Sequence, residues 1–257
     1  MDVNSFPPSR PAPAPRRGFP RLWHVAALII AAIGAVVASG LVFGERPDWG
    51  PHPTARFAFI ETDPVTGEAV RFDPCSDVRY VVNPVGAPPG AMADLRRSLE
   101  LISEAAGLTF VDEGLTDEVP GFGRRAYQHR RYGRRWAPVL IGWVDDGDEG
   151  FRHGGLGIGK AAIRESDRGV RAIVSGWVML NANATLRPGF GPGDTWGEVI
   201  VHELAHVLGL AHVDDPRQIM YPSVTPGPAR LGSGDIDGLR WVGDWGDCRK
   251  VPPPGSS

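Results

Sequence analysis

Residues 202–212 read HELAHVLGLAH and bring three histidines close together in the chain. On a helix, His202 and His206 are four positions apart, so their imidazoles project from one face and can bind the same ion. Gly209 can adopt a positive φ that ends the helix and turns the chain back, which lets His212 supply a third nitrogen. Three protein ligands with a fourth position open to water are typical of catalytic zinc, whereas structural zinc is held by four.

Glu203 adds a carboxylate beside this group, near the ion but not needed as a ligand. Zinc lowers the pKa of a bound water to about 7 and polarises a scissile carbonyl, so a neighbouring carboxylate can act as general base. A purely structural site has no need of that carboxylate. The stretch therefore predicts a zinc-dependent hydrolase with one catalytic zinc ion, and a non-catalytic zinc-binding surface module is the alternative.

These residues resemble a known family. HELAHVLGLAH matches the HExxHxxGxxH motif of the metzincin metalloendopeptidases, and QIMYP (Gln218–Pro222) matches their Met-turn. The spacing from His212 to Met220 and the later DIDGL (Asp235–Leu239) are most similar to the matrixin branch, in a compact bacterial form. The specific motifs lie within residues 195–242, and over residues 71–194 only the order of elements corresponds.

The resemblance implies a fold and a set of roles. The fold is α+β (mixed α/β), with a twisted mixed five-stranded sheet, a long helix before it, an active-site helix and a C-terminal helix. Glu203 would take a proton from zinc-bound water and return it to the leaving amine, and Met220 would form the apolar floor beneath the metal. Tyr221 and Pro222 would start the wall of the S1′ pocket. The zinc ligands would be His202, His206 and His212.

In metzincins the substrate pairs as an extra strand with an edge strand that precedes the active-site helix. By element order this strand would be residues 155–162, a case of β-augmentation. The residues expected to line the substrate pocket there are Gly155, Leu156, Gly157 and Ile158. One position departs from the family, because Val224 stands where matrixins carry a tyrosine.

Hydrophobic patterning predicts the other elements. Short apolar runs predict strands over residues 56–61, 78–83, 108–112, 138–144, 156–163 and 172–181. Apolar residues at three- and four-residue spacing predict a helix over 89–106 that ends at Gly107. Two more helices are expected, one over 195–208 and a short one from Ser233.

The first 44 residues differ from the rest. Residues 1–21 carry four arginines against Asp2 and six prolines, so we expect a disordered cytoplasmic arm. Residues 22–43 read LWHVAALIIAAIGAVVASGLVF, about 33 Å as a helix, which matches a bilayer core. We expect residues 22–44 to be a membrane anchor or a cleaved signal peptide. The anchor would give a single-pass cell-membrane protein with the catalytic domain outside, and cleavage would give a secreted protein.

Residues 45–257 are expected to form three segments. We expect a spacer over 45–70, one catalytic domain over 71–248 and a disordered tail over 249–257. The net charge of −3 for the whole chain argues against a domain that binds nucleic acid by bulk charge. The predicted partners are therefore a protein or peptide substrate and the membrane, with no nucleic acid, and the protein is expected to be a monomer.

Cys75 and Cys248 are the chain's two cysteines. An oxidising compartment outside the cytoplasm permits a disulfide between them, and two free buried thiols are the alternative. The DPCSD stretch around Cys75 is faintly similar to the propeptide motif whose cysteine caps the zinc of matrixins. About thirty residues separate it from the apolar segment, too few for a folded prodomain, so Cys248 is the better partner.

Other motifs have plainer interpretations. GGLGIGKA (residues 154–161) fits the GxxxxGK of a phosphate loop, but Ala161 replaces the required Ser or Thr and strand-like residues follow. The run from Arg124 to Arg135 holds six arginines with aromatic residues and could bind nucleic acid or anionic lipid, although a solvated loop is the preferred interpretation.

Additional metal sites have weaker support. DDGDE (Asp145–Glu149) could hold calcium through its carboxylates, but an acidic turn explains it as well. His129 and His153 could form a second zinc site with these aspartates.

Overall fold

The computed structural model describes residues 56–64, 66–145, 149–151, 155–227 and 229–254. The predicted arm and membrane segment, residues 1–44, lie outside the described residues. Within the described ranges, no helix is both long and apolar enough to cross a membrane. In chain order the elements are β1 (Ala58–Phe59), β2 (Val78–Asn83), α2 (Ala91–Ala106), β3 (Phe110–Leu115), α3 (His129–Tyr132), β4 (Val139–Val144), a 3-10 turn (Glu149–Phe151), β5 (Gly157–Glu165), β6 (Arg171–Asn181), α4 (Trp196–Leu208), β7 (Leu210–Ala211) and α5 (Ser233–Val242).

The five central strands form one mixed sheet in the order β3-β2-β4-β6-β5. Four of them are parallel, and β5 runs antiparallel to β6 at one edge. This confirms the predicted α+β fold with a mixed five-stranded sheet. The long helix α2 lies between β2 and β3 in the chain, so it follows the first strand of this sheet rather than preceding the sheet.

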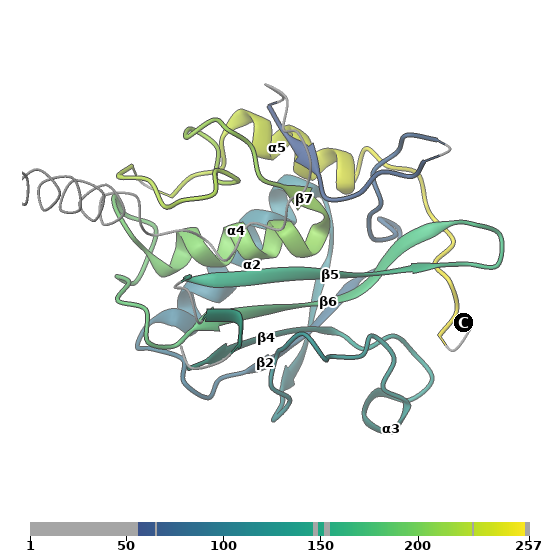
Figure 1. Cartoon of the computed structure of the whole chain (residues 1–257), viewed down its shortest axis with the longest axis horizontal. Coiled ribbons are helices and arrows are strands. Elements are labelled where there is room, and N and C mark those ends of the chain that lie inside the picture. The colour runs from purple at the N-terminus through teal and green to yellow at the C-terminus, as the bar shows by residue number, and fades with distance from the viewer. Residues whose placement is uncertain (1–55, 65, 146–148, 152–154, 228, 255–257) are drawn as a thin grey trace, which may run out of the picture. The chain divides into compact units, whose positions relative to one another are not determined.

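Hydrophobic cores cover both faces of the sheet. On one face α2 and α4 pack together, with α5 against α2, and their buried side chains include Leu95, Ile102 and Ile200. In Figure 1, α4 runs beside β5 and β6, with α2 behind it and α5 above. A smaller cluster on the other face includes Leu140 and Met179. Burying each such side chain stabilises the fold by about 1.5–3 kcal/mol.

The folded domain begins earlier than predicted. β1 pairs antiparallel with β7, with Ala58 opposite Ala211 and Phe59 opposite Leu210. A strand was predicted over residues 56–61, within the segment 45–70 that was expected to be a spacer, and β1 lies inside that predicted strand. The pairing partner lies far along the chain and each strand has only two residues, so no local pattern indicates it.

The domain also ends later than predicted. The Arg249 backbone N–H donates to Asp73 at 2.9 Å, and its guanidinium donates to Glu68 at 2.6 Å. The Trp136 indole N–H donates to the Pro252 carbonyl at 2.8 Å. Residues 249–254 are therefore held by tertiary hydrogen bonds, and the disordered tail predicted over 249–257 was wrong for this part.

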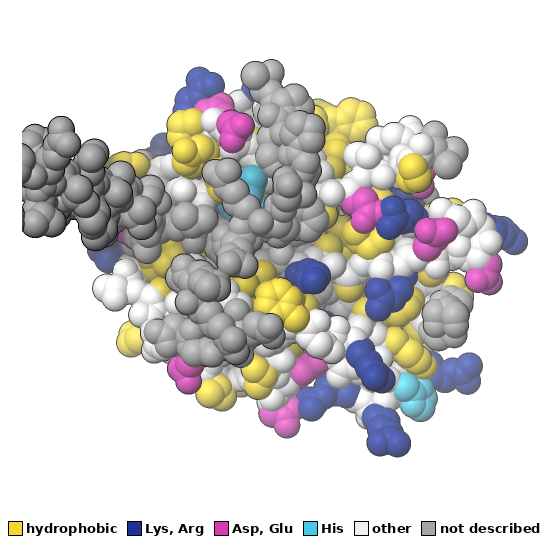
Figure 2. Space-filling view, viewed as in Figure 1, with side chains coloured by type: hydrophobic (Ala, Val, Ile, Leu, Met, Phe, Trp, Pro, Cys, Tyr) yellow, Lys and Arg dark blue, Asp and Glu magenta, His cyan; other side chains and the backbone are white. Residues whose placement is uncertain are grey.

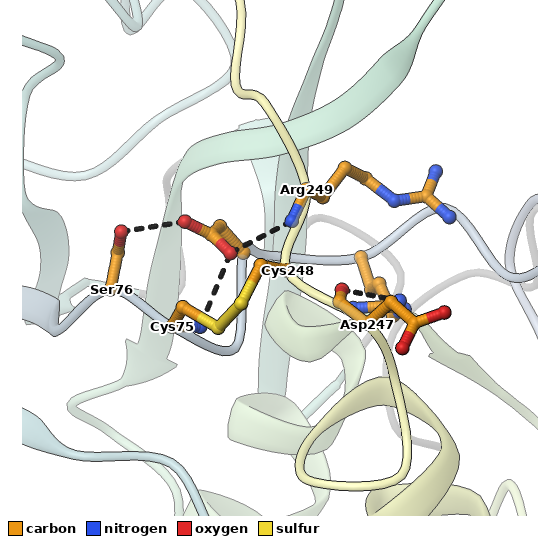
Figure 3. Close-up of a disulfide and its surroundings, with 7 residues drawn as sticks. Cys75, Ser76, Asp247, Cys248 and Arg249 are labelled. Carbon is orange, nitrogen blue, oxygen red and sulfur yellow. Dashed lines mark hydrogen bonds between the residues drawn. A yellow bond between two sulfur atoms is a disulfide. The ribbon is translucent and has the colours of Figure 1, made fainter.

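Cys75 and Cys248 form the predicted disulfide, with Cα atoms 5.3 Å apart (Figure 3). Asp73 accepts hydrogen bonds from the Cys75 backbone N–H, the Ser76 hydroxyl and the Arg249 backbone N–H. The alternative of two free thiols is excluded, since neither cysteine is free. Because Cys75 is in the disulfide, it is not available to cap a metal.

The arginine-rich run is not a simple solvated loop. The Arg124 side chain is 4% exposed, pairs with Glu118 at 3.0 Å, and donates to the carbonyls of Pro138 and Gly176. Arg135 pairs with Glu113. The solvated-loop interpretation was wrong for Arg124, because its guanidinium is buried and binds partners inside the domain. Other Lys and Arg side chains gather on the surface around α3, at the lower right of Figure 2.

Candidate metal centre

Helix α4 presents the metal ligands, and local signals set both its ends. The Thr195 hydroxyl accepts from the Glu198 backbone N–H at 3.4 Å, the usual N-cap interaction. Gly209 ends the helix with φ 109°, in the left-handed region predicted for it. The next two residues form β7, and its pairing with β1 fixes the path of the chain into His212.

The three histidines converge as the sequence predicts. The Nε2 atom of His212 lies 3.1 Å from Nε2 of His202 and 3.0 Å from Nε2 of His206. On the far sides of the rings, His202 Nδ1 lies 2.7 Å from the Ile219 carbonyl oxygen and His206 Nδ1 lies 2.7 Å from that of Leu210. A carbonyl only accepts, so both Nδ1 atoms carry the proton and both Nε2 lone pairs face the centre of the group.

Burial keeps the imidazoles of His202 and His206 neutral. It lowers the pKa of His206 to about 4. It lowers the pKa of His202 well below its usual value, and the neighbouring His206 and His212 lower it further. Neutral imidazole is the form that binds metal ions.

The geometry fits zinc. With Zn–N bonds of about 2.0–2.1 Å at tetrahedral angles, ligand nitrogens are separated by about 3.3 Å, close to the observed distances. Among the described residues, the group that could hold the ion contains these three histidines and no fourth ligand. His202, His206 and His212 thus fit a catalytic zinc site, which leaves one position for water or substrate.

Glu203 lies between this group and the edge strand. Its side chain is buried, and its Oε1 atom has no hydrogen-bond partner within the described part of the chain. Burial raises the pKa of Glu203 to about 8, while a hydrogen bond with the Gly159 backbone acts in the opposite direction. A Cβ atom added to Gly157 would lie 2.6 Å from Cγ of Glu203, so glycine is needed for β5 to approach so closely.

The four residues predicted to line the substrate pocket have different environments. Gly157 lies against Glu203. Leu156 is buried in the main core, and Ile158 packs on the opposite face of the sheet. The Gly155 carbonyl accepts from the Asn181 amide at 3.0 Å. The Leu156 side chain is therefore not available to a substrate, because it is packed inside the hydrophobic core.

The Met-turn is held by a residue whose role the sequence analysis missed. Asp235 of α5 accepts from the backbone N–H groups of Ile219 at 2.6 Å, Met220 at 3.2 Å and Gly232 at 2.7 Å. Met220 is buried, and its carbonyl accepts from the Val213 N–H, next to His212. DIDGL was noted only for its similarity to matrixins, although its first aspartate ties the Met-turn to α5. Beyond the turn, Pro222 is buried and Tyr221 is partly exposed.

The other predicted metal sites gain no support. Residues 146–148 and His153 lie outside the described residues, so the calcium site and the second zinc site stay predictions. Within the described ranges, His129 belongs to no group able to hold a metal. Possible ligand atoms of Asp73, Cys75 and Cys248 also lie within 4.8 Å of one another, but the two sulfur atoms are bonded in the disulfide.

Comparison with known proteins agrees with this geometry. Residues 190–242 match the model of the matrixin family. The chain is 28% identical to matrix metalloproteinase-16 from Homo sapiens over 193 residues, which cover 69% of this chain and 27% of that protein. It is 52% identical to metalloendoproteinase 1 from Glycine max over 44 residues, or 16% of this chain and 14% of that protein. Residues 190–242 of the chain are therefore similar to matrixins.

The segment that matches the matrixin model contains α4, His212, the Met-turn and α5, which together build the metal centre. The chain spans about a quarter of matrix metalloproteinase-16 and a smaller share of the soybean protein. The similarity to the family therefore covers the metal-binding segment, and activity has to be argued from the site.

Proposed function

We propose that the chain is a zinc-dependent endopeptidase that hydrolyses peptide bonds with Glu203 as general base. The observation that carries the proposal is the convergence of three imidazole nitrogens beside a buried carboxylate that takes no part in the ligand set. A site built only to hold zinc for stability has no use for that carboxylate.

Each residue of the site has a separate role in the proposed hydrolysis. A zinc ion held by the three histidines would act as a Lewis acid and lower the pKa of a water molecule. As general base, Glu203 would accept a proton from the attacking water and donate it to the nitrogen of the leaving amine. The carbonyls of Ile219 and Leu210 hold the imidazole rings in orientation through their Nδ1–H groups. Met220 forms an apolar floor beneath the site.

The substrate is proposed to lie along β5. This strand is the last in the sheet order, and its glycines bring its backbone close to Glu203. An extended peptide can add to such an edge through main-chain hydrogen bonds. Proline at a β5 position whose N–H faces away from β6 removes one N–H from the free edge and should raise KM for peptides more than it lowers kcat. An unchanged KM contradicts this placement.

The test of the proposed function uses the full chain loaded with zinc. The wild-type protein should degrade a denatured protein, and a chelator should abolish this activity. Glu203→Ala should lose activity by about 10²-fold or more while it retains one zinc per chain by elemental analysis. Glu104→Ala, on the exposed side of α2, is the matched control. Zinc binding without proteolysis in the wild-type protein would instead support the non-catalytic module.

We also propose that the domain works outside the cytoplasm, as a monomer. The Cys75–Cys248 disulfide supports this location, because such bridges persist in oxidising compartments. A reporter enzyme that is active only outside the cytoplasm, fused after Ser257, tests the location. An inactive reporter contradicts it. Whether residues 22–44 stay as a membrane anchor is read from the mass of the mature chain, and light scattering tests the monomer.

A further inference from the structure

Helix α4 carries a second buried carboxylate for which the proposed reaction has no use. Glu198 lies one helical turn before His202 and on the same face of α4. Its side chain reaches the loop after the Met-turn, where Oε1 accepts from the Thr225 backbone N–H at 3.1 Å. Its Oε2 atom is buried and has no hydrogen-bond partner among the described residues. Glu198 as a whole is 4% exposed.

This carboxylate lines a cavity of about 280 Å³. The cavity lies between α4, residues 216–219 and residues 225–227 and 229–232, and its apolar lining includes Ile219, Ala229 and Leu231. It adjoins the metal centre, because the Ile219 carbonyl accepts from His202 Nδ1. Pockets for whole small molecules measure roughly 300–1,000 Å³, so this volume suits a single side chain.

The charges around Glu198 do not include a partner cation. None of the ion pairs within the described part of the chain involves Glu198. Burial raises its pKa to about 7, the Thr225 N–H acts in the opposite direction, and the negative Asp194 raises it further. Two arginines line the cavity. Both the Nε and Nη2 atoms of Arg217 donate to Asp215 at 2.9 Å, and Arg230 is exposed and forms no ion pair with Glu198. A buried carboxylate without a partner is costly, and a cation entering the cavity offsets that cost.

We propose that this cavity receives a lysine or arginine side chain of the peptide substrate, next to the scissile bond, and that Glu198 selects it. The apolar lining accommodates the aliphatic stem of such a side chain, and the free Oε2 atom accepts from its charged head. The proposal rests on the proposed endopeptidase function. It assigns a substrate class: peptides with a basic residue beside the cleaved bond.

The test compares peptides that differ at one residue flanking the cleaved bond, with lysine, methionine or glutamate there. The zinc-loaded full chain should cleave the lysine peptide with a kcat/KM about tenfold or more above that of the methionine peptide. Glu198→Gln keeps the acceptor for Thr225 but lacks the charge, so the lysine-to-methionine ratio should fall about tenfold, mainly through KM. Glu104→Gln, an equal charge change on exposed α2, should leave the ratio unchanged.

A second measurement does not depend on catalysis. In the Glu203→Ala background, fluorescence anisotropy should show the labelled lysine peptide binding more tightly than the methionine peptide, and Glu198→Gln should remove the difference. A cleavage map of denatured proteins by mass spectrometry should place Lys or Arg beside most cleaved bonds.

Several results overturn the proposal. The proposal is wrong if the ratio of kcat/KM for the lysine peptide to that for the methionine peptide is the same in the wild-type protein and in Glu198→Gln. An equal loss on all three peptides means that Glu198 only supports the Thr225 loop. If Glu198→Gln does not fold, a wild-type cleavage map without a basic preference is decisive. Failure of the proposed function looks different, because the zinc-loaded protein would then cleave no substrate at all.

Discussion

Gly157→Ala should remove activity while leaving the fold and the metal ligands in place. An added Cβ atom would lie 2.6 Å from Cγ and 2.8 Å from Oε1 of Glu203. Carbon atoms pack at about 3.5–4.0 Å, so the carboxylate has to move by about 1 Å. A displacement of that size at a reacting group costs about 10²-fold in rate. Gly157 does not have a positive φ, so alanine adds no backbone strain.

The assay is kcat/KM on one peptide, measured beside zinc content and thermal unfolding. We expect a loss of about 10²-fold in kcat/KM, one zinc per chain, and a stability loss within the ~1–3 kcal/mol typical of overpacking. Gly121→Ala is the matched control, because its added Cβ atom would have no heavy atom within 4 Å and its φ is not positive. Wild-type activity in Gly157→Ala would refute the reasoning that β5 positions the Glu203 carboxylate.

Three further predictions concern stability. Asp235→Ala leaves the buried N–H groups of Ile219 and Met220 and the partly buried N–H of Gly232 without their acceptor. At about 1–3 kcal/mol for each buried group, urea unfolding should show a loss of at least about 2 kcal/mol, and a loss below 1 kcal/mol contradicts the role of Asp235. Reducing the disulfide between Cys75 and Cys248, which are separated by 173 positions, should lower the unfolding free energy by up to about 5 kcal/mol, and an unchanged melting temperature in reductant argues against the bridge. Burial alone would raise the pKa of Glu118, but hydrogen bonds from Tyr132, Gln128 and Arg124 outweigh it, so the folded pKa lies below the ordinary value of 4.5. The resulting stability is complete above 4.5 and is lost as pH falls through the folded pKa, so the melting temperature of Glu118→Gln should depend less on pH between 5 and 3 than that of the wild-type protein.

The accuracy of the sequence analysis follows the distance over which each interaction acts. The spacing of His202 and His206 fixes their common face within one helical turn, and Gly209 turns the chain within three residues of His212. The spacing of residues within the motif is enough to predict this short-range geometry. The pairing of β1 with β7 depends on residues far apart in the chain, so the apolar run over residues 56–61 predicted a strand but not its partner. Arg124 was mistaken for a solvated residue because its partners, Glu118 and the carbonyl of Gly176, lie on different segments.

The sequence by itself determined the ligand set, the carboxylate beside it and the mixed sheet, because helical spacing, a glycine turn and apolar strand patterns act locally. It also supplied the two cysteines of the disulfide. Only the tertiary structure decided that Asp235 anchors the Met-turn, that Gly157 faces Glu203, and that Glu198 lines a cavity with one oxygen unpaired. These contacts join segments that are far apart in the chain, and a local sequence pattern does not indicate which distant segments pack together.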